Sequence, residues 1–172
     1  DKLNQEIFER EKAELALRES EEHYRSLFEN MLEGFAYCQM LYDDDQNPSD
    51  WIYLSVNSSF DQITGLSGVQ GKRATEVFPG IRDSSPELFK IYSRVAETGV
   101  PEMFETYFSH LSIWLRISVY QPRVDHFVAV FENITARKQT EEDLKKVVRD
   151  HQTILENVPS MILFKDTQNR YI

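Results

Sequence analysis

The residues that interrupt helices are confined to the middle of this 172-residue chain. All six glycines and five of the six prolines lie between Gly34 and Pro122. Glycine and proline break helical segments, so the segments on either side can form long helices, whereas the middle must fold with frequent turns. The distribution therefore predicts a central domain flanked by two long helices.

Charge and composition narrow the range of partners. Lys and Arg number 19 against 29 for Asp and Glu, which gives a net charge of −10. A surface this acidic repels phosphate, so we expect no nucleic-acid partner. The single cysteine, Cys38, excludes a disulfide framework and a thiolate-based zinc site. No apolar run approaches the roughly 18 residues that a membrane-spanning helix needs.

From these features we expect a cytoplasmic segment without direct membrane insertion, although its parent protein could be attached to a membrane elsewhere. The chain begins with Asp1 rather than Met, and Asn169 to Ile172 resemble the start of a strand. We therefore expect a fragment of a longer protein.

Both flanking segments have apolar residues at alternating spacings of three and four. Charged or polar residues interrupt each line, so two interpretations stay open. The helices could pair with a second copy, which would give a parallel homodimer, or they could pack on their own domain. The first line comprises Leu3, Ile7, Arg10, Glu14, Leu17, Glu21, Tyr24 and Phe28, and the second Ile134, Arg137, Glu141, Leu144, Val148, His151, Leu155 and Val158.

Alternating patterns and turn signals in the middle predict five strands, a short helix and a longer one. Asn57 is placed to cap the short helix, which Gly65 ends, and Ser85-Pro86 begins the longer helix, which ends at Gly99. Residues 66–80 have no clear pattern. The predicted strands are 34–42, 51–56, 102–109, 111–120 and 126–134. This order predicts an α+β fold with a five-stranded antiparallel sheet and short helices on one face.

The fourth predicted strand has two chemically different faces. Leu115 and Ile117 belong to an aliphatic row that should face the helices, whereas Trp114 and Tyr120 lie on the opposite face. An outer face with large rings needs cover, and a flanking helix is the candidate.

A short segment of the sequence is repeated near its end. Residues 27–31 (Leu-Phe-Glu-Asn-Met) resemble residues 154–158 (Ile-Leu-Glu-Asn-Val), and an apolar run follows each. A repeat at this distance predicts tandem copies of one domain, the second beginning near the end of the chain.

The order of these motifs resembles a PAS domain of the sensory-box type. The matching segments are 24–30, Asn57 with Phe60 and Thr64-Gly65, Gly71, 76–80, 114–116 and 131–138. The last segment is similar to the family's Asp-Ile-Thr-Glu-Arg-Lys motif, where the final strand passes into a signalling helix. Asn133 and Ala136 depart from that motif, and Asn133 removes its negative charge while keeping an oxygen that can cap a helix.

The resemblance implies a domain order and a role. Residues 1–23 would form an N-terminal helical linker, 24–134 the PAS domain, 135–157 the signalling helix, and 158–172 the start of a second PAS domain. The implied function is a sensory and dimerisation module of a signalling protein, with a histidine kinase as output and a diguanylate cyclase as the alternative. The residues expected to transfer the signal are Trp114, Asn133, Ile134, Thr135, Arg137 and Lys138.

PAS domains bind flavin, haem, small metabolites or nothing, so the fold does not determine the ligand. Photochemical flavin members need a cysteine that residues 66–80 lack, and haem members use a histidine that residues 86–98 lack. The histidines do not cluster at metal-ligand spacing, and no catalytic motif is present. We therefore expect no cofactor, no metal and no enzymatic activity in this segment, with a flavin or small-metabolite receptor as the alternative.

Any ligand would lie between the aliphatic sheet face and the helices. The alternative is a core that large side chains fill completely. The candidate pocket residues are Tyr37, Tyr53, Phe60, Ile63, Phe78, Phe89, Tyr92, Leu115 and Ile117.

Overall fold

A computed structural model describes residues 2–157 and 167–168. The chain divides into two compact units, residues 1–133 and 134–172. The first unit contains the helix α1 (Lys2–Glu29), a sheet and four further helices, and the second contains α6 (Thr135–Asn157). The predicted second PAS copy at 158–172 lies outside the described residues, except for an exposed turn at 167–168.

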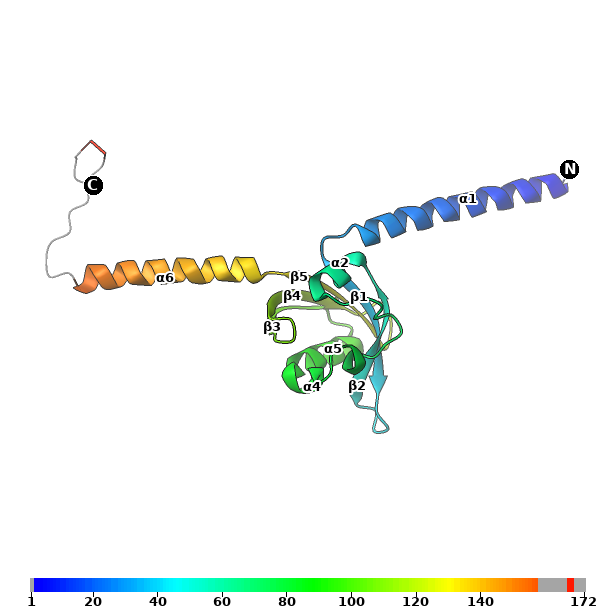
Figure 1. The fold of residues 1–172 in the computed structure, drawn as a ribbon. Helices are drawn as coiled ribbons and strands as arrows, with labels where there is room; N and C mark the ends of the chain where they lie inside the picture. The colour runs from blue at the N-terminus through cyan, green and yellow to red at the C-terminus, as the bar shows by residue number, and fades with distance from the viewer. Residues whose placement is uncertain (1, 158–166, 169–172) are drawn as a thin grey trace. The chain divides into compact units, whose positions relative to one another are not determined.

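The first unit is built on one five-stranded antiparallel sheet with the strand order β2-β1-β5-β4-β3 (Figure 1). This confirms the predicted α+β architecture. Strand β2 begins earlier than predicted because Pro48 pairs with Tyr42, and β4 begins later because the chain turns at Ser112, whose φ is 55°. The strands are β1 (Gly34–Tyr42), β2 (Pro48–Val56), β3 (Glu102–Phe108), β4 (Ile113–Tyr120) and β5 (His126–Asn133).

The helices α2 to α5 follow β2, and α4 and α5 lie together against one face of the sheet in Figure 1. They are α2 (Ser58–Thr64), α3 (Ala74–Val77), α4 (Ile81–Ser84) and α5 (Pro86–Thr98). The predicted ends at Gly65 and Gly99 are confirmed, and both glycines adopt a left-handed conformation that closes the helix. Ser85 precedes α5 as predicted, but its side chain makes no capping hydrogen bond.

Residues 66–80, for which the sequence suggested no regular structure, contain α3. This short helix is tied to β2 by the buried side chain of Asp50, which accepts hydrogen bonds from the Thr75 hydroxyl at 2.5 Å and the Trp51 amide at 2.9 Å. A buried carboxylate needs such partners, because burial without them is costly. Tertiary contacts rather than local sequence therefore stabilise α3.

Strand alternation decides which side chains enter the core. On β1, Ala36, Cys38 and Met40 are buried, while Phe35 and Tyr37 point to the opposite face and are only half-buried. On β4 the predicted aliphatic row is buried at Leu115, Ile117 and Val119. The core therefore lies between this face and helices α2 to α5.

Aromatic rings fill one side of that core. The Trp51 ring lies 4.7 Å from Phe89, 5.2 Å from Tyr92 and 5.9 Å from Phe127, measured between ring centroids. Tilted and edge-on contacts of this kind add to the stabilisation from buried area. They bind β2, α5 and β5 into one cluster.

None of the helices among residues 2–157 is long and apolar enough to cross a lipid bilayer.

Candidate functional site

A cavity of about 60 Å³ lies between the inner sheet face and the helices. Residues of all five strands supply one wall, and residues of α2, α4 and α5 supply the other. Small side chains at Ala36, Cys38 and Ala129 leave the space open, because each stands where a larger residue would fill it. The core is therefore incompletely filled beside these small residues.

The predicted pocket residues separate into two groups. Those that line the cavity are Tyr53, Phe60, Phe78, Tyr92, Leu115 and Ile117. The others, Tyr37, Ile63 and Phe89, are partly buried and do not line it. Tyr37 belongs to the outer set of β1, and Phe89 lies against Trp51 instead of the cavity.

Sequence reasoning missed much of the lining. The alternation of side chains along a strand could have identified several of these residues. Ala36 lies on the same face of β1 as the buried Cys38. Ala129 and Phe131 lie on the same face of β5 as the buried Phe127. Leu111 belonged to the predicted strand 111–120 but lies in a turn, and Ile81, which begins the four-residue helix α4, had no such signal. The further lining residues are Ala36, Cys38, Trp51, Thr64, Ile81, Leu88, Phe108, Leu111, Phe127, Ala129 and Phe131.

The polar groups that line the cavity stay uncharged. Burial raises the pKa of the Cys38 thiol and of the Tyr53 and Tyr92 hydroxyls well above their ordinary values. The Thr64 hydroxyl donates a hydrogen bond to the carbonyl oxygen of Phe60 at 2.7 Å. The cavity wall therefore carries no formal charge.

Flavin and haem, which the family resemblance raised, do not fit this cavity. Pockets for ligands of that size occupy roughly 300–1,000 Å³ and present polar groups that orient the ligand. The observed space is about 60 Å³, well below that range, although its lining includes the polar side chains of Cys38, Tyr53, Thr64 and Tyr92. Among the described residues, no group of three His, Cys, Asp or Glu could hold a metal ion.

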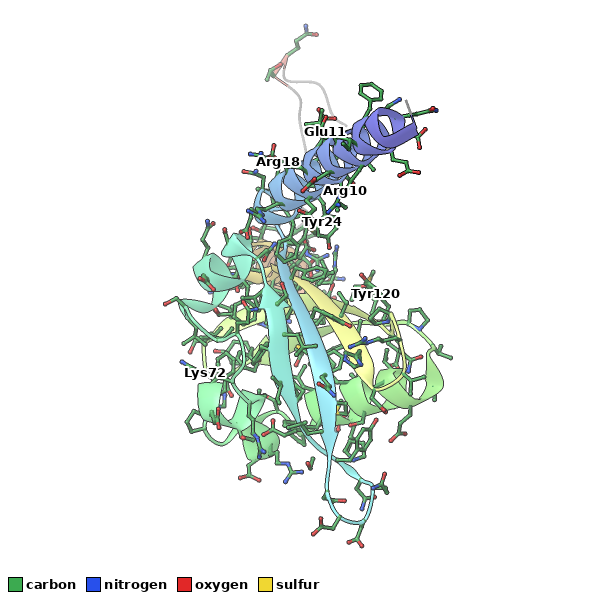
Figure 2. The ribbon with its side chains drawn as sticks, turned by 90° about the vertical axis from the view of Figure 1, so that its right-hand side faces the viewer. Arg10, Glu11, Arg18, Tyr24, Lys72 and Tyr120 are labelled. Atoms are coloured by element: carbon green, nitrogen blue, oxygen red, sulfur yellow. The ribbon has the colours of Figure 1, made fainter. Side chains whose placement is uncertain are left out.

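A second hollow lies on the outer face of the sheet, at the end of α1. It is an open groove lined by Tyr24 and Phe28 of α1 and by Tyr37, Tyr120 and Val128 of the sheet. Figure 2 shows Tyr24 near the domain end of α1 and Tyr120 near the neighbouring end of the sheet. The end of α1 therefore lies over the outer face of the sheet at Tyr120, which is one of the two large rings that a flanking helix was predicted to cover.

The end of α1 is joined to the core through Asn57, which is 2% exposed. Its side-chain oxygen accepts hydrogen bonds from the amides of Phe35 at 2.9 Å and Phe60 at 3.0 Å. Its side-chain nitrogen donates to the carbonyl oxygens of Phe28 at 3.2 Å and Glu33 at 3.0 Å. One residue thus caps α2 as predicted and also holds the segment that links α1 to β1.

The residues predicted to transfer a signal fall in two places. Trp114 lies on the outer face of β4, where its ring is 5.7 Å from that of Tyr107. Asn133 ends β5, and Ile134, which is buried, separates it from the start of α6. Thr135, Arg137 and Lys138 belong to the first turns of α6, where Arg137 and Glu141 form a 3.9 Å ion pair.

Beside Trp114, charged side chains cross the sheet from strand to strand. Arg116 forms ion pairs with Glu132 at 2.9 Å and with Glu105 at 3.5 Å. All three side chains are partly exposed, so each pair contributes little to stability on its own. Their effect is to fix the side-chain orientation across β3, β4 and β5.

Comparison with known proteins identifies the domain. A sequence model described as a PAS domain matches residues 22–97. No curated protein is similar enough in sequence to be counted as a relative.

Several solved structures are similar at low sequence identity. An RNA-binding light-oxygen-voltage receptor is 18% identical with a TM-score of 0.47, and the match covers 74% of this chain but only 37% of the receptor. A domain of an HTR-like protein from Haloarcula marismortui is 16% identical with a TM-score of 0.47, covering 61% of this chain and 100% of that domain. A PAS domain from Colwellia psychrerythraea is 12% identical with a TM-score of 0.46, covering 67% and 97% respectively.

The matched segment runs from the last turns of α1 almost to the end of α5, and β3 to β5 complete its sheet. Residues 22–97 therefore form part of a PAS domain.

Proposed function

We propose that this chain is the sensory and dimerisation module of a multidomain signal-transduction protein, in which two copies pair through α1 and α6. A PAS domain is a sensory module without catalytic activity of its own. The output domain we propose is a histidine kinase on the same polypeptide, with a diguanylate cyclase as the alternative. The similarity of residues 131–138 to the family's exit motif supports this choice.

The observation that carries the dimer is the apolar stripe of α6, formed by Leu144, Val147, Val148, Ile154 and Leu155. At 100° per residue these side chains fall within about 120° of the helix surface, interrupted only by His151. Leu144 is 64% exposed and Leu155 is 52% exposed. A 23-residue helix with such a surface is marginal alone, so a partner helix would stabilise it.

The helix α1 presents a weaker version of the same feature. Ile7, Leu15, Leu17 and Leu27 are each about half exposed or more, but charged residues divide them. Only the last turns of α1 meet the sheet, at the Tyr24 and Phe28 positions. We therefore assign the main dimer contact to α6 and a supporting contact to α1.

The path from the sensory domain to the output is short. Strand β5 ends at Asn133 and α6 begins at Thr135, with neither glycine nor proline between them. A connection without a flexible hinge would pass a displacement of β5 to the helix rather than absorb it. Two helices that pair weakly could then change their packing, as a two-state element requires.

Light scattering of the purified chain over a range of concentrations tests the dimer. We expect the wild type to approach twice the monomer mass, and Leu144→Lys with Leu155→Lys to shift it toward the monomer. Gln139→Lys adds the same kind of charge outside the stripe and should leave the mass unchanged. A wild-type monomer at every concentration would contradict the proposal.

The output requires a separate experiment on the full-length protein. Incubation with labelled ATP should yield an acid-labile, base-stable phosphohistidine if the output is a kinase. Incubation with GTP should instead yield a cyclic dinucleotide if it is a diguanylate cyclase. The second result would overturn the kinase assignment and leave the sensory role intact, whereas neither product would contradict both outputs.

A further inference from the structure

We propose that the groove between the last turns of α1 and the outer face of the sheet, here called the outer groove, binds one small organic cation of the quaternary ammonium class. This goes beyond the sensory and dimerisation role inferred above, which assigns no ligand to this face of the sheet. Three properties of the outer groove define the ligand: its volume, its aromatic rings and its charge.

The outer groove is large enough to hold a small organic molecule. Its volume is about 650 Å³, and ligand pockets occupy roughly 300–1,000 Å³. Its lining includes the buried side chain of Val128, whereas Tyr24 is 67% exposed and Tyr120 is 40% exposed. The two tyrosines therefore present ring surface to a molecule that enters from solvent.

Aromatic rings line the outer groove from the helix and from the sheet. On the helix side, Tyr24 stacks on Phe28 with the ring centroids 6.2 Å apart, and Phe28 meets Phe35 of β1 edge-on at 5.0 Å. On the sheet side, burial and then the nearby Tyr24 raise the pKa of Tyr120, so its hydroxyl adds no charge. A cation between these rings would meet several aromatic faces, which is how proteins recognise quaternary ammonium groups.

The charge at the end of α1 also favours a cation. A helix carries a partial negative charge at its C-terminal end, which a basic residue in the last turn can offset. The last turn of α1 has no basic residue and ends in Glu29, whose carboxylate lines the outer groove. The amide and the hydroxyl of Ser58 donate hydrogen bonds that hold this carboxylate in place. The negative end of the helix is therefore left for a ligand to offset.

Two further charged side chains of α1 line the outer groove, and they oppose each other. Glu21 adds a second carboxylate beside Glu29, whereas Arg25 supplies a positive charge. Carboxylates thus outnumber guanidinium groups in the lining, and the net charge of −10 on the whole chain draws cations toward its surface. A cationic ligand gains from Glu21 and is opposed by Arg25, whereas for an anionic ligand these two roles would be exchanged.

A ligand in the outer groove would contact the helix and the sheet together. Tyr24 and Phe28 belong to α1, and Phe35 and Tyr120 belong to β1 and β4. Asn57 already holds the carbonyl oxygen of Phe28, so the ligand would add a second attachment one turn earlier in the helix. Binding would therefore stabilise the packing of the last turns of α1 on the sheet, and α1 is a helix that we assign to the dimer.

Three benzyl compounds of different charge test the site: benzyltrimethylammonium, the neutral benzyl alcohol and the anionic phenylmethanesulfonate. Each is titrated into the complete chain while the amide shifts are followed by NMR. We expect the cation to give saturable shifts at Tyr24, Tyr120 and Val128, and the neutral compound to bind at least about fivefold more weakly because it lacks the charge. Equal affinity for benzyl alcohol, or saturable shifts centred on Ile117 in the core, would overturn the proposal.

Substitutions of Glu21 and Arg25 distinguish a cation from an anion as the ligand. Glu21→Gln should weaken the binding of benzyltrimethylammonium by about two- to fivefold, and Arg25→Gln should strengthen it by a similar factor, because the first removes an attractive charge and the second a repulsive one. Glu14→Gln, on α1 but outside the outer groove, is the matched control and should leave the affinity unchanged. Tighter binding of phenylmethanesulfonate, weakened by Arg25→Gln, would show that the groove selects anions.

The aromatic rings have their own pair of variants. Tyr24→Leu should weaken binding by about two- to fivefold, which corresponds to one exposed cation–π contact, whereas Tyr24→Phe keeps the ring and should bind like the wild type. Both substitutions lie at an exposed position, so the domain should stay folded. Equal affinities of Tyr24→Leu and the wild type would show that the rings do not hold the cation.

These outcomes are separable from the proposed function. If α1 of a second copy fills the outer groove instead, the dimer would not bind benzyltrimethylammonium, and Tyr24→Leu would lower the mass measured by light scattering. That result would overturn the cation site and leave the dimerisation role standing. A monomer that binds the cation with the expected selectivity would do the reverse.

Discussion

The side-chain nitrogen of Asn57 donates a hydrogen bond to the main-chain carbonyl oxygen of Phe28, 3.2 Å away. The two residues lie 29 positions apart in sequence, one before α2 and the other in the last turn of α1. Beside this contact, the amide of Ser58 donates to the carboxylate of Glu29 at 3.0 Å, and the Ser59 hydroxyl donates to the carbonyl oxygen of Met31. The end of α1 is thus attached to the start of α2 by several independent hydrogen bonds.

Replacing Asn57 with alanine should destabilise this junction. The change removes four hydrogen bonds and leaves the amides of Phe35 and Phe60 with fewer partners. We expect a loss of about 2–4 kcal/mol in the free energy of unfolding, measured by urea denaturation. Hydrogen exchange should accelerate most at the amides of Phe35 and Phe60.

Ser58→Ala is the matched control for that substitution. It removes only the hydrogen bond from the Ser58 hydroxyl to Glu29, at an exposed position, and keeps the one from the Ser58 amide, so we expect a loss below about 1 kcal/mol. Equal effects of Asn57→Ala and Ser58→Ala would show that Asn57 does not hold the junction.

Gly34 is required where β1 approaches β5. A Cβ atom at this position would lie 2.5 Å from carbon atoms of the Phe131 ring. Gly34→Ala should therefore cost about 1–3 kcal/mol in unfolding free energy, because the ring would have to move within a packed core. Phe131→Leu in the same chain should recover part of the loss, measured as non-additivity in a double-mutant cycle. Strict additivity of the two substitutions would contradict the contact.

Much of the fold could be predicted because its signals are local. Gly99 ends α5 through its own left-handed backbone, and the alternation of Leu115 and Ile117 with Trp114 determines which face of β4 is buried. Each such signal depends on residues that are neighbours in sequence. They required no knowledge of what lies across the sheet.

The site was less predictable because it depends on residues that are distant in sequence. Aromatic character suggested Tyr37 as pocket lining, but the strand places Ala36 and Cys38 in the core and Tyr37 beneath the end of α1. The cavity exists because small residues of β1 and β5 face each other, as Ala36 and Ala129 do across the two strands. That pairing is a property of register, which no single segment of sequence specifies.

The ion pair between Arg94 and Glu102 predicts a pH dependence. The Arg94 guanidinium donates two hydrogen bonds to the carboxylate, at 2.5 and 2.6 Å, and these lower the pKa of Glu102. A carboxyl whose pKa is lower in the folded state stabilises the fold above its unfolded pKa, and this stabilisation is lost as the pH falls through the folded pKa. Carboxyl-carbon NMR should therefore give a pKa for Glu102 below the ordinary glutamate range.

Arg94→Gln should return the pKa of Glu102 to the ordinary range and remove its share of the acid dependence. Lys90→Gln is the control. It removes a different exposed ion pair, the one between Lys90 and Glu87 of α5, and should leave the pKa of Glu102 unchanged. A Glu102 pKa that does not respond to Arg94→Gln would show that the pair does not persist in solution.

Cys38 should be unreactive in the folded protein. The residue is 1% exposed, and burial raises the pKa of its thiol, so both access and thiolate formation are suppressed. We expect a thiol reagent to label it at a rate that follows urea concentration through the unfolding transition. Rapid labelling in native buffer, at a rate similar to that of the unfolded chain, would place Cys38 at the surface instead of beside the cavity.

Disulfide cross-linking along α6 tests the central claim, the pairing of two copies through this helix. Single cysteines at Leu144, Val148 and Leu155 occupy the stripe, and cysteines at Glu142 and Arg149 occupy the opposite face, with Cys38 replaced by serine as background. A parallel dimer predicts rapid intermolecular disulfides at all three stripe positions and slow ones at the two controls. An antiparallel pair would link at most one stripe position, and equal rates at all five positions would contradict pairing through α6.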